Sequence, residues 1–577
     1  MLIRVYPYFK PYRTQCLLAL VALFATHLVE AAIPLYLKQG IDLITRQQAN
    51  IATPIQIILF LTLLRYLLLN YGRRRNALVS TGLAGALRQA VYAHLLTLGR
   101  NFYARYSLGD LMARATQDIA TIQRFFRMSV HHFLSLTSII LIAPVFMWQQ
   151  SQTLTLLLIP LMLGIGVVGW FLASRIRISS ARQQSEYATL TEVVQQNLQG
   201  IRTIQAHAQE AREIKHFKTT SKTYVNAMQQ QIRWDALLNG CMLLGSGLMT
   251  LVVAGVGGSQ VQQGVISIGT LTAFVLYLTM ILNVIKNCAT PIFYLLTASS
   301  AAQRVFQLMD ETPEIADVTD TLEVLPIRGE LILSGVTYCY LSESNPANTA
   351  VEDISITIQP GEKVVIIGAV GAGKSTLLRL LSRQIEPTVG EITLDGRALN
   401  SIPLKQLRHN IGFVTQESFL FATTLRENIS FDKPERPEEP IWDAANHAQL
   451  GTTIQHFSTG LETLLGERGI TLSGGQKQRT ALARGLIRQP PVLLLDDCFS
   501  ALDTETSSLI LDAINERRAT QTTVMVTHRV AHAFNADKIL VMAQGRMIES
   551  GTHQSLMAKK GHYAELVRSQ EKEAVVA

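Results

Sequence analysis

Apolar residues gather into six long runs in the first half of the chain, and polar stretches separate them. A bilayer core about 30 Å thick requires roughly 20 apolar residues in a helix, and each run approaches that length. The pattern therefore predicts six membrane-spanning helices, at about residues 16–37, 54–71, 130–148, 154–173, 237–257 and 269–290.

Two long polar segments, 72–129 and 174–236, keep a helical periodicity and lack the Gly/Pro clusters that mark loops. Each is therefore predicted to continue its flanking helices beyond the membrane as a helical hairpin. Each carries nine basic residues, whereas the turns at 149–153 and 258–268 carry none. Because basic residues favour the cytoplasmic side, both hairpins and both termini are predicted to be cytoplasmic, in a multi-pass protein of the cytoplasmic (inner) membrane.

From Ile327 onward the pattern changes to short β-type runs separated by turns. We therefore expect an all-α, six-helix membrane domain followed by an α/β domain that also lies in the cytoplasm. The expected boundaries are 1–310 for the membrane domain, 311–326 for a linker, 327–570 for the α/β domain and 571–577 for a tail.

Composition and charge favour a membrane protein over a soluble one. Of the 577 residues, 48% are hydrophobic and 16% are charged, whereas soluble proteins carry about 25% charge. Residues 1–310 hold 26 basic against 10 acidic side chains, and the remainder holds 25 against 33. The basic excess coincides with the apolar runs, so it indicates a lipid bilayer and not nucleic acid as the partner.

The predicted spans contain the ionisable residues His27, Glu30, Arg65 and Lys286, which are costly to bury in lipid, and Glu30 and Arg65 are the candidates for a pair. A helix rises 1.5 Å per residue, so Glu30 lies about 21 Å from the inner end of its span and Arg65 about 16 Å from the outer end of an antiparallel neighbour. The two side chains can therefore reach similar depths. They are either a structural ion pair between helices or part of a substrate pathway.

A glycine-rich segment, Gly368-Ala-Val-Gly-Ala-Gly-Lys-Ser375, follows the apolar run 363–368 and precedes a helix-like segment. This is the P-loop pattern in its expected context. Gly368, Gly371 and Gly373 let backbone N–H groups converge into an anion site at a helix N-terminus. Lys374 would then reach the β- and γ-phosphates of ATP, and Ser375 would bind Mg²⁺.

A second apolar run, 492–495, ends in the carboxylates Asp496 and Asp497, as expected of a Walker B strand. Asp496 would hold the Mg²⁺ shell, through water, and Asp497 would face the attacking water as a general base.

The segment Leu472-Ser-Gly-Gly-Gln476 stands between these two elements. With it the chain resembles the ATP-binding cassette (ABC) transporters, for which LSGGQ is the distinguishing signature. The resemblance covers nearly the whole chain and indicates a half-transporter of the exporter type, a class that includes bacterial lipid flippases and multidrug exporters. It implies that the cassette pairs with a second one, and that the signature acts on the partner's ATP through Ser473, Gly474, Gly475 and Gln476.

The resemblance also implies roles for single residues outside the P-loop. Tyr340 corresponds to the aromatic residue that stacks on adenine, and Thr376 belongs to the phosphate-binding helix start. Gln416 corresponds to the Q-loop glutamine that touches Mg²⁺, Asp503 to the D-loop, and His528 to the switch histidine that contacts the γ-phosphate.

One position departs from the family pattern. The residue after the Walker B aspartate is normally glutamate, and here it is Asp497. The side chain is shorter by one methylene, which retracts the carboxylate by roughly 1.5 Å, and a misplacement near 1 Å can cost about a hundredfold in rate. We therefore expect ATP binding to survive and hydrolysis at this site to be impaired; the alternative is that aspartate substitutes with a small loss.

Because the signature is intact while the base is degenerate, the sequence favours a heterodimer with a second half-transporter that carries the glutamate; a homodimer is the alternative. The predicted function is ATP-driven export of a hydrophobic or amphipathic compound, lipid or drug-like. A second hypothesis is an ATP-binding regulatory or gating subunit with negligible turnover. The basic balance of residues 1–310 is explained by the hairpins and inner-leaflet lipids, without an anionic cargo.

Overall fold

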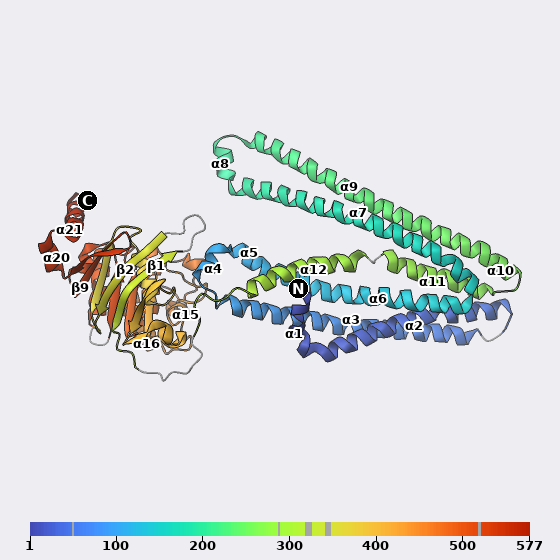
Figure 1. Ribbon diagram of the computed structural model, residues 1–577, viewed down its shortest axis with the longest axis horizontal. Helices are drawn as coiled ribbons and strands as arrows, with labels where there is room; N and C mark the ends of the chain where they lie inside the picture. Colours follow the sequence, from blue (N-terminus) through green and yellow to red (C-terminus); the bar gives the residue numbers. More distant parts are fainter. Residues whose placement is uncertain (49–50, 287–288, 318–325, 341–347, 517–520, 577) are drawn as a thin grey trace. The chain divides into compact units, whose positions relative to one another are not determined.

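The computed structural model describes residues 1–577 except 49–50, 287–288, 318–325, 341–347, 517–520 and 577 (Figure 1). These residues form two compact units. The helical unit comprises Met1–Thr97 and Tyr106–Glu311, and the cassette unit comprises Leu98–Arg105 and Thr312–Ala577. Half of the linker expected at 311–326, residues 318–325, lies outside the described residues.

Long helices make up the helical unit. Five are long and apolar enough to cross a membrane, and a sixth, at Ile268–Val284, is apolar but shorter. The helices are α1 (Tyr6–Phe9), α2 (Arg13–Thr45), α3 (Ala52–Leu95), α5 (Leu108–Ala113), α6 (Ile119–Gln150), α7 (Gln152–Gln199), α8 (Ile201–Ala206), α9 (Glu210–Val252), α10 (Gly258–Gln262), α11 (Ile268–Lys286) and α12 (Ala289–Met309). The all-α membrane domain predicted from the apolar runs is confirmed.

The polar segments continue the flanking helices, as their periodicity predicts. Helix α3 runs on to Leu95, and α7 and α9 lie side by side as one long hairpin whose far end carries the short α8 (Figure 1). Prolines at positions 34, 144 and 160 stay inside helices, which membrane helices tolerate when neighbours satisfy the freed backbone groups.

The segment Leu98–Arg105, expected within the membrane domain, instead groups with the cassette unit. Its helix α4 (Arg100–Arg105) buries the ring of Phe102, and the Phe102 N–H donates to Glu314 Oε1 at 2.9 Å. The Cβ of any other residue at Gly99 would stand 2.7 Å from Glu314 Oε2. The contact between residues more than 200 positions apart has no local sequence signal.

The cassette unit contains two sheets. The larger has the order β10-β9-β3-β8-β7-β6, in which all strands but the antiparallel β10 are parallel. The smaller, β2-β1-β4-β5, is antiparallel. The strands are β1 (Leu331–Tyr340), β2 (Asn348–Ile358), β3 (Lys363–Gly368), β4 (Val389–Leu394), β5 (Arg397–Ala398), β6 (Ile411–Val414), β7 (Val492–Asp496), β8 (Thr522–Val526), β9 (Lys538–Ala543) and β10 (Arg546–Gly551).

Alternate residues of the parallel strands enter two different cores, because side chains along a strand point to opposite faces. The helices of this unit are α13 (Lys374–Leu381), α14 (Leu404–Asn410), α15 (Leu425–Ile429), α16 (Glu438–His447), α17 (Gly451–Gln455), α18 (Gly474–Leu486), α19 (Thr504–Asn515), α20 (His553–Lys559) and α21 (His562–Val576). Val364 and Ile366 belong to a core shared with the antiparallel sheet and the helices α13 and α14, whereas Val365 and Ile367 belong to a core shared with α15 to α21. Helix α21 extends through residues 571–576 of the tail expected at 571–577.

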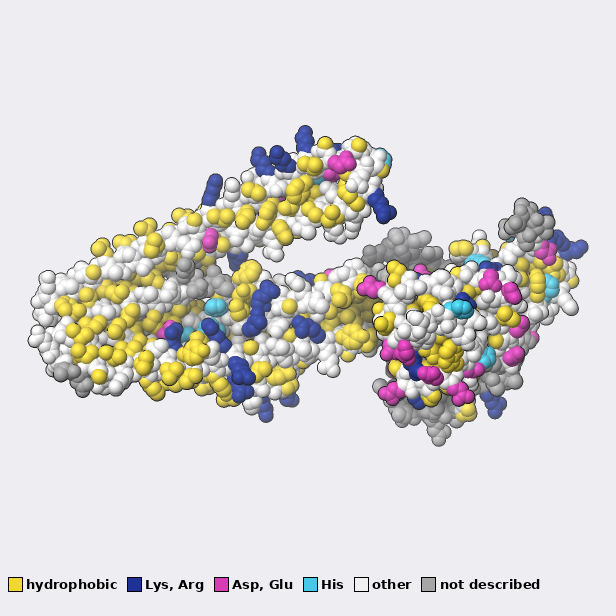
Figure 2. Space-filling view, turned by 180° about the vertical axis from the view of Figure 1, so that it is seen from behind, with side chains coloured by type: hydrophobic (Ala, Val, Ile, Leu, Met, Phe, Trp, Pro, Cys, Tyr) yellow, Lys and Arg dark blue, Asp and Glu magenta, His cyan; other side chains and the backbone are white. Residues whose placement is uncertain are grey.

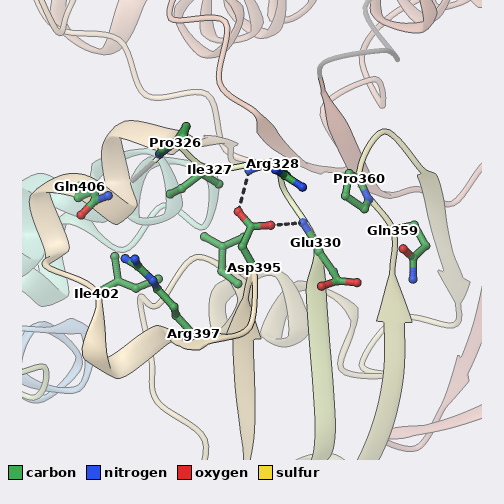
Figure 3. Close-up of a pocket in the computed structure, with 11 residues that line it drawn as sticks. Pro326, Ile327, Arg328, Glu330, Gln359, Pro360, Asp395, Arg397, Ile402 and Gln406 are labelled. Atoms are coloured by element: carbon green, nitrogen blue, oxygen red, sulfur yellow. Dashed lines mark hydrogen bonds between the residues drawn. The ribbon is translucent and has the colours of Figure 1, made fainter. Parts of the chain in front are cut away.

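The first strand of the cassette is fixed by one carboxylate. Asp395, in the turn after β4, accepts hydrogen bonds from the backbone N–H groups of Arg328 (2.7 Å) and Glu330 (2.9 Å), which Figure 3 draws, and from that of Gly329 (3.1 Å). These donors precede β1 and have no strand partner of their own. The Asp395 side chain therefore joins the entry into β1 to the β4–β5 turn, beside a cavity of about 400 Å³.

We predict that Asp395→Ala lowers the stability of the protein by about 2 kcal/mol, because three backbone donors lose a charged acceptor. The measurement is the thermal unfolding midpoint of the purified full-length chain in detergent, which should fall by a few degrees. Asp395→Asn, which keeps one acceptor oxygen, should lose less. Equal midpoints for Asp395→Ala and the parent chain would contradict this role.

Candidate nucleotide-binding site

The carboxyl ends of β3, β6, β7 and β8 meet at one edge of the parallel sheet, which is where α/β proteins place their sites. The P-loop follows β3, Gln416 follows β6, Asp497 follows β7 and His528 follows β8. The sheet thus gathers at one edge residues that are spread over 160 positions of the sequence.

The P-loop closes tightly against its neighbours. Gly373 has a φ of +94°, and a Cβ on it would lie 2.1 Å from the carbonyl oxygen of Ala350. At Gly368 a Cβ would lie 2.2 Å from the Met542 carbonyl oxygen. Only glycine fits these two positions, so the loop's course into α13 is set by the residue type.

The Lys374 ammonium lies inside this loop. It donates to the carbonyl oxygens of Gly368 (2.7 Å) and Ala369 (2.8 Å), and the side chain is 5% exposed. Burial lowers the pKa of Lys374, while the nearby Asp497 and Asp496 oppose that change. A buried cation ringed by backbone groups at a helix start fits a phosphate group, which would replace the carbonyl contacts with stronger ones.

Two side-chain pairs stand next to the lysine. Ser375 Oγ donates to Asp496 Oδ1 at 2.8 Å, and Gln416 Nε2 donates to Asp497 Oδ2 at 3.4 Å. Of the three residues predicted to hold Mg²⁺, Ser375 and Asp496 are thus hydrogen-bonded to each other, and Gln416 is hydrogen-bonded to the neighbouring Asp497. Hydroxyl, amide and carboxylate oxygens are the ligands that Mg²⁺ prefers, so the donor set fits that ion.

Asp497 is held firmly by its backbone. Its φ is +45°, a left-handed conformation that aspartate tolerates better than most residues, and its N–H donates to the Val526 carbonyl oxygen at 3.0 Å. Burial raises the pKa of Asp497; His528 opposes the change, and Asp496 adds to it. The carboxylate is therefore more basic than an ordinary aspartate, and its backbone is tied to β8.

Tyr340 and Thr376, both predicted to contact nucleotide, are close to each other. The Tyr340 hydroxyl lies 3.1 Å from Thr376 Oγ1 and accepts from Arg379 Nη1 at 3.3 Å. The end of β1 is therefore tied to the first turns of α13, next to the P-loop.

The signature opens a helix. Ser473 caps α18: its Oγ accepts from the Gln476 N–H (3.3 Å), and its own N–H donates to Gln476 Oε1 (2.9 Å). Ser473 and Gly474 are exposed, and a Cβ on Gly475 would lie 3.1 Å from the Ala501 carbonyl oxygen. Among the residues that the structure describes, no hydrogen bond or ion pair links the signature to the P-loop of the same chain.

One connection was not predicted. Gln478 of α18 donates to Ser500 Oγ (2.9 Å) and accepts from the Ala501 N–H (2.9 Å), which ties the signature helix to the D-loop. Asp503 then caps α19 by accepting from the Thr506 N–H at 2.8 Å, and these hydrogen bonds lower the pKa of Asp503. No local pattern indicates the role of Gln478, because its partners lie 22 and 23 residues further along the chain.

The structure also brings the intramembrane pair together. Arg65 Nη2 donates to Glu30 Oε1 at 2.5 Å, and His27 Nδ1 donates to Glu30 Oε2 at 3.2 Å. Glu30 therefore accepts one hydrogen bond from its own helix, α2, and one from α3.

Comparisons with known proteins agree with this geometry. Residues 16–285 match the family model of the ABC transporter transmembrane region, and residues 351–500 match that of the ABC transporter cassette. The structure superposes on that of a bacterial Atm1-family ABC exporter with ATP bound, with a TM-score of 0.78 and 25% identity, over 97% of this chain and 98% of that one.

Relatives from several organisms match nearly the whole chain. The uncharacterized ABC transporter ATP-binding protein YwjA of Bacillus subtilis is 31% identical over 99% of both chains. A putative multidrug export ATP-binding/permease protein of Staphylococcus aureus is 29% identical, over 98% of this chain and 99% of its own. The human mitochondrial potassium channel ATP-binding subunit is 31% identical, over 96% of this chain and 76% of its own. The chain therefore belongs to the ABC transporter family, as an exporter-type half-transporter whose nucleotide-binding cassette is an ATPase coupled to transport.

Proposed function

We propose that this chain is the weak-site half of a heterodimeric exporter of the cytoplasmic membrane, which moves a hydrophobic or amphipathic substrate, lipid or drug-like, outward. The observation that carries the proposal is Asp497 at the end of β7, where the family places glutamate. Its backbone is hydrogen-bonded to β8, so the shorter side chain stays retracted from the position that a glutamate carboxylate reaches.

The chain's own residues would divide the work at the nucleotide site. The P-loop amides and Lys374 bind the phosphates, and Tyr340 takes the base. Ser375, Asp496 and Gln416 would hold Mg²⁺, which when bound neutralises charge on the phosphates. Asp497 accepts a proton from water slowly because its side chain is short, and His528 contacts the γ-phosphate.

The exposed signature supports a dimer in which the two ATP sites differ. Ser473 and Gly474 are exposed at a helix N-terminus and make no described contact with their own P-loop. A partner's nucleotide would find there the backbone donors of a helix start. If the partner carries glutamate, this intact signature completes the competent site, and the heterodimer hydrolyses ATP mainly there.

A relative's name favours a second candidate function. The human protein that matches 96% of this chain is an ATP-binding subunit of a mitochondrial potassium channel. With a weak base in both cassettes, the present chain would instead act as a regulatory or gating subunit that binds ATP without appreciable turnover. Export is preferred because the bacterial relatives include a putative multidrug exporter of the same length.

We predict that Lys374→Ala reduces labelling of this chain by a photoreactive ATP analogue about tenfold or more, because it removes the buried cation of the phosphate cradle. Lys405→Ala, an exposed lysine on α14, is the matched control and should leave labelling unchanged. Normal labelling of Lys374→Ala would contradict the assignment of the P-loop.

We predict that in the purified complex Asp497→Asn changes the steady-state ATPase rate by less than about twofold, because the partner's base carries most of the turnover, whereas Ser473→Ala lowers the rate further. Asp497→Glu should raise the rate up to about twofold by making the second site competent.

The same three variants separate the alternatives. A loss of about a hundredfold or more in Asp497→Asn would show that this residue is the working base, as in a homodimer, and would refute the weak-site proposal. A parent rate near background, raised only by Asp497→Glu, would favour the regulatory function.

A further inference from the structure

A polar cavity lies among four helices of the helical unit, lined by residues of the predicted spans and by Arg73, just beyond the predicted span 54–71. It has a volume of about 260 Å³, below the usual size of a site that encloses a whole small molecule. Figure 2 shows basic, acidic and histidine side chains gathered at one place within the hydrophobic surface of this unit. The polar residues that line the cavity are Thr26, His27, Glu30, Arg65, Arg73, His131, His132, Ser135 and Asn283.

Helical spacing brings these residues to one place. On α3, Arg65, Leu69 and Arg73 recur every four residues and so share a face. On α6 the same relation joins His131 to Ser135. The faces meet because α2 and α6 each contact the other three of the helices α2, α3, α6 and α11.

The cavity has an unbalanced positive charge. Glu30 is its one carboxylate and is already bound by Arg65 and His27. Arg73 lines the cavity but makes no hydrogen bond or ion pair within the part of the chain that the structure describes. One guanidinium is therefore left for a ligand of opposite charge.

Several buried polar atoms in the cavity also lack partners. His27 Nε2, on a side chain that is 4% exposed, has none among the described residues, nor do Arg65 Nε and His131 Nδ1. Leaving such atoms unpaired in an apolar environment costs free energy. An apolar ligand would not satisfy them, and a cation would be repelled by the arginines. The described residues also offer no group of three His, Cys, Asp or Glu side chains that could hold a metal ion.

We propose that this cavity binds the anionic group, carboxylate or phosphate, of an amphipathic molecule whose apolar part stays in the adjacent lipid or helix interface. Arg73 is the anchoring cation, and the unpaired Arg65 Nε–H and His131, in the tautomer that carries its proton on Nδ1, complete the site as donors. These residues, and not the overall excess of basic residues in the chain, indicate an anionic ligand. Its link to export rests on the proposed function, which it narrows to acidic amphiphiles.

The test is equilibrium binding of radiolabelled dodecyl phosphate to the purified full-length protein in phosphatidylcholine nanodiscs, without ATP. Arg73→Gln should weaken binding about tenfold, because a charge-assisted contact is lost, and Arg73→Lys should weaken it less. Arg74→Gln is the matched control: Arg74 is the next residue, is exposed and does not line the cavity. Arg73 is itself exposed, so neither change threatens the fold. Dodecanoate should compete, whereas dodecanol and dodecyltrimethylammonium should not.

Two further competitors identify the source of the anion. Phosphatidic acid at a tenth of the nanodisc lipid would compete if the natural ligand is a lipid head group, and millimolar inorganic phosphate would compete if a free anion suffices; either result supports the site. The proposal is overturned if Arg73→Gln binds like the parent, if Arg74→Gln loses as much, or if dodecanol competes as well as dodecanoate. Binding as expected without ATP-driven export would refute the proposed function alone, since the binding assay requires no transport.

Discussion

Five parallel strands end at one edge of the cassette sheet, and the backbone hydrogen bonds between them determine where each group of the nucleotide site stands. Asp496 pairs with Val526 across β7 and β8, and the next N–H, that of Asp497, is also bonded to β8. The P-loop follows β3, which pairs with β8, and it places Lys374 close enough to Asp496 and Asp497 for both carboxylates to raise its pKa. Moving one group therefore requires breaking the sheet, so a shortened side chain cannot be compensated by a shift of the backbone.

The weak-site proposal depends on this rigidity at Asp497. The effects of its environment are opposed: burial and Asp496 raise its pKa, which makes the carboxylate a better base, while His528 lowers it. Basicity alone does not restore catalysis, because proton transfer requires contact with the attacking water. In the proposed weak site, a carboxylate that is more basic but set back would preserve the charge balance around Lys374, and thus nucleotide binding, while slowing hydrolysis.

Features set by a short stretch of sequence could be predicted, and features set by distant contacts could not. The P-loop, the β7 strand with its two carboxylates and the apolar helices each follow from local spacing, so these were accessible. The tie from Gln478 to Ser500 and Ala501, the grouping of Leu98–Arg105 with the cassette and the extent of α21 depend on partners elsewhere in the chain or on helix propagation. The Glu30–Arg65 pair could be predicted in part, because the helix rise gives the depth of each residue in the membrane but not the direction in which its side chain points.

Rotation of four helices decides what the polar residues of the helical unit do. Had α3 been turned by half a turn, Arg65 and Arg73 would face lipid, and Glu30 would be left with His27 alone. In the orientation found, Glu30 neutralises Arg65, and Arg73, His131 and His132 line the same cavity. A purely structural pair needs only Glu30 and Arg65, since each neutralises the other. The additional His131 and His132 increase the cost of burying polar groups, and Arg73 adds a second cation, without strengthening that pair; the proposed anionic ligand supplies the interaction that offsets both.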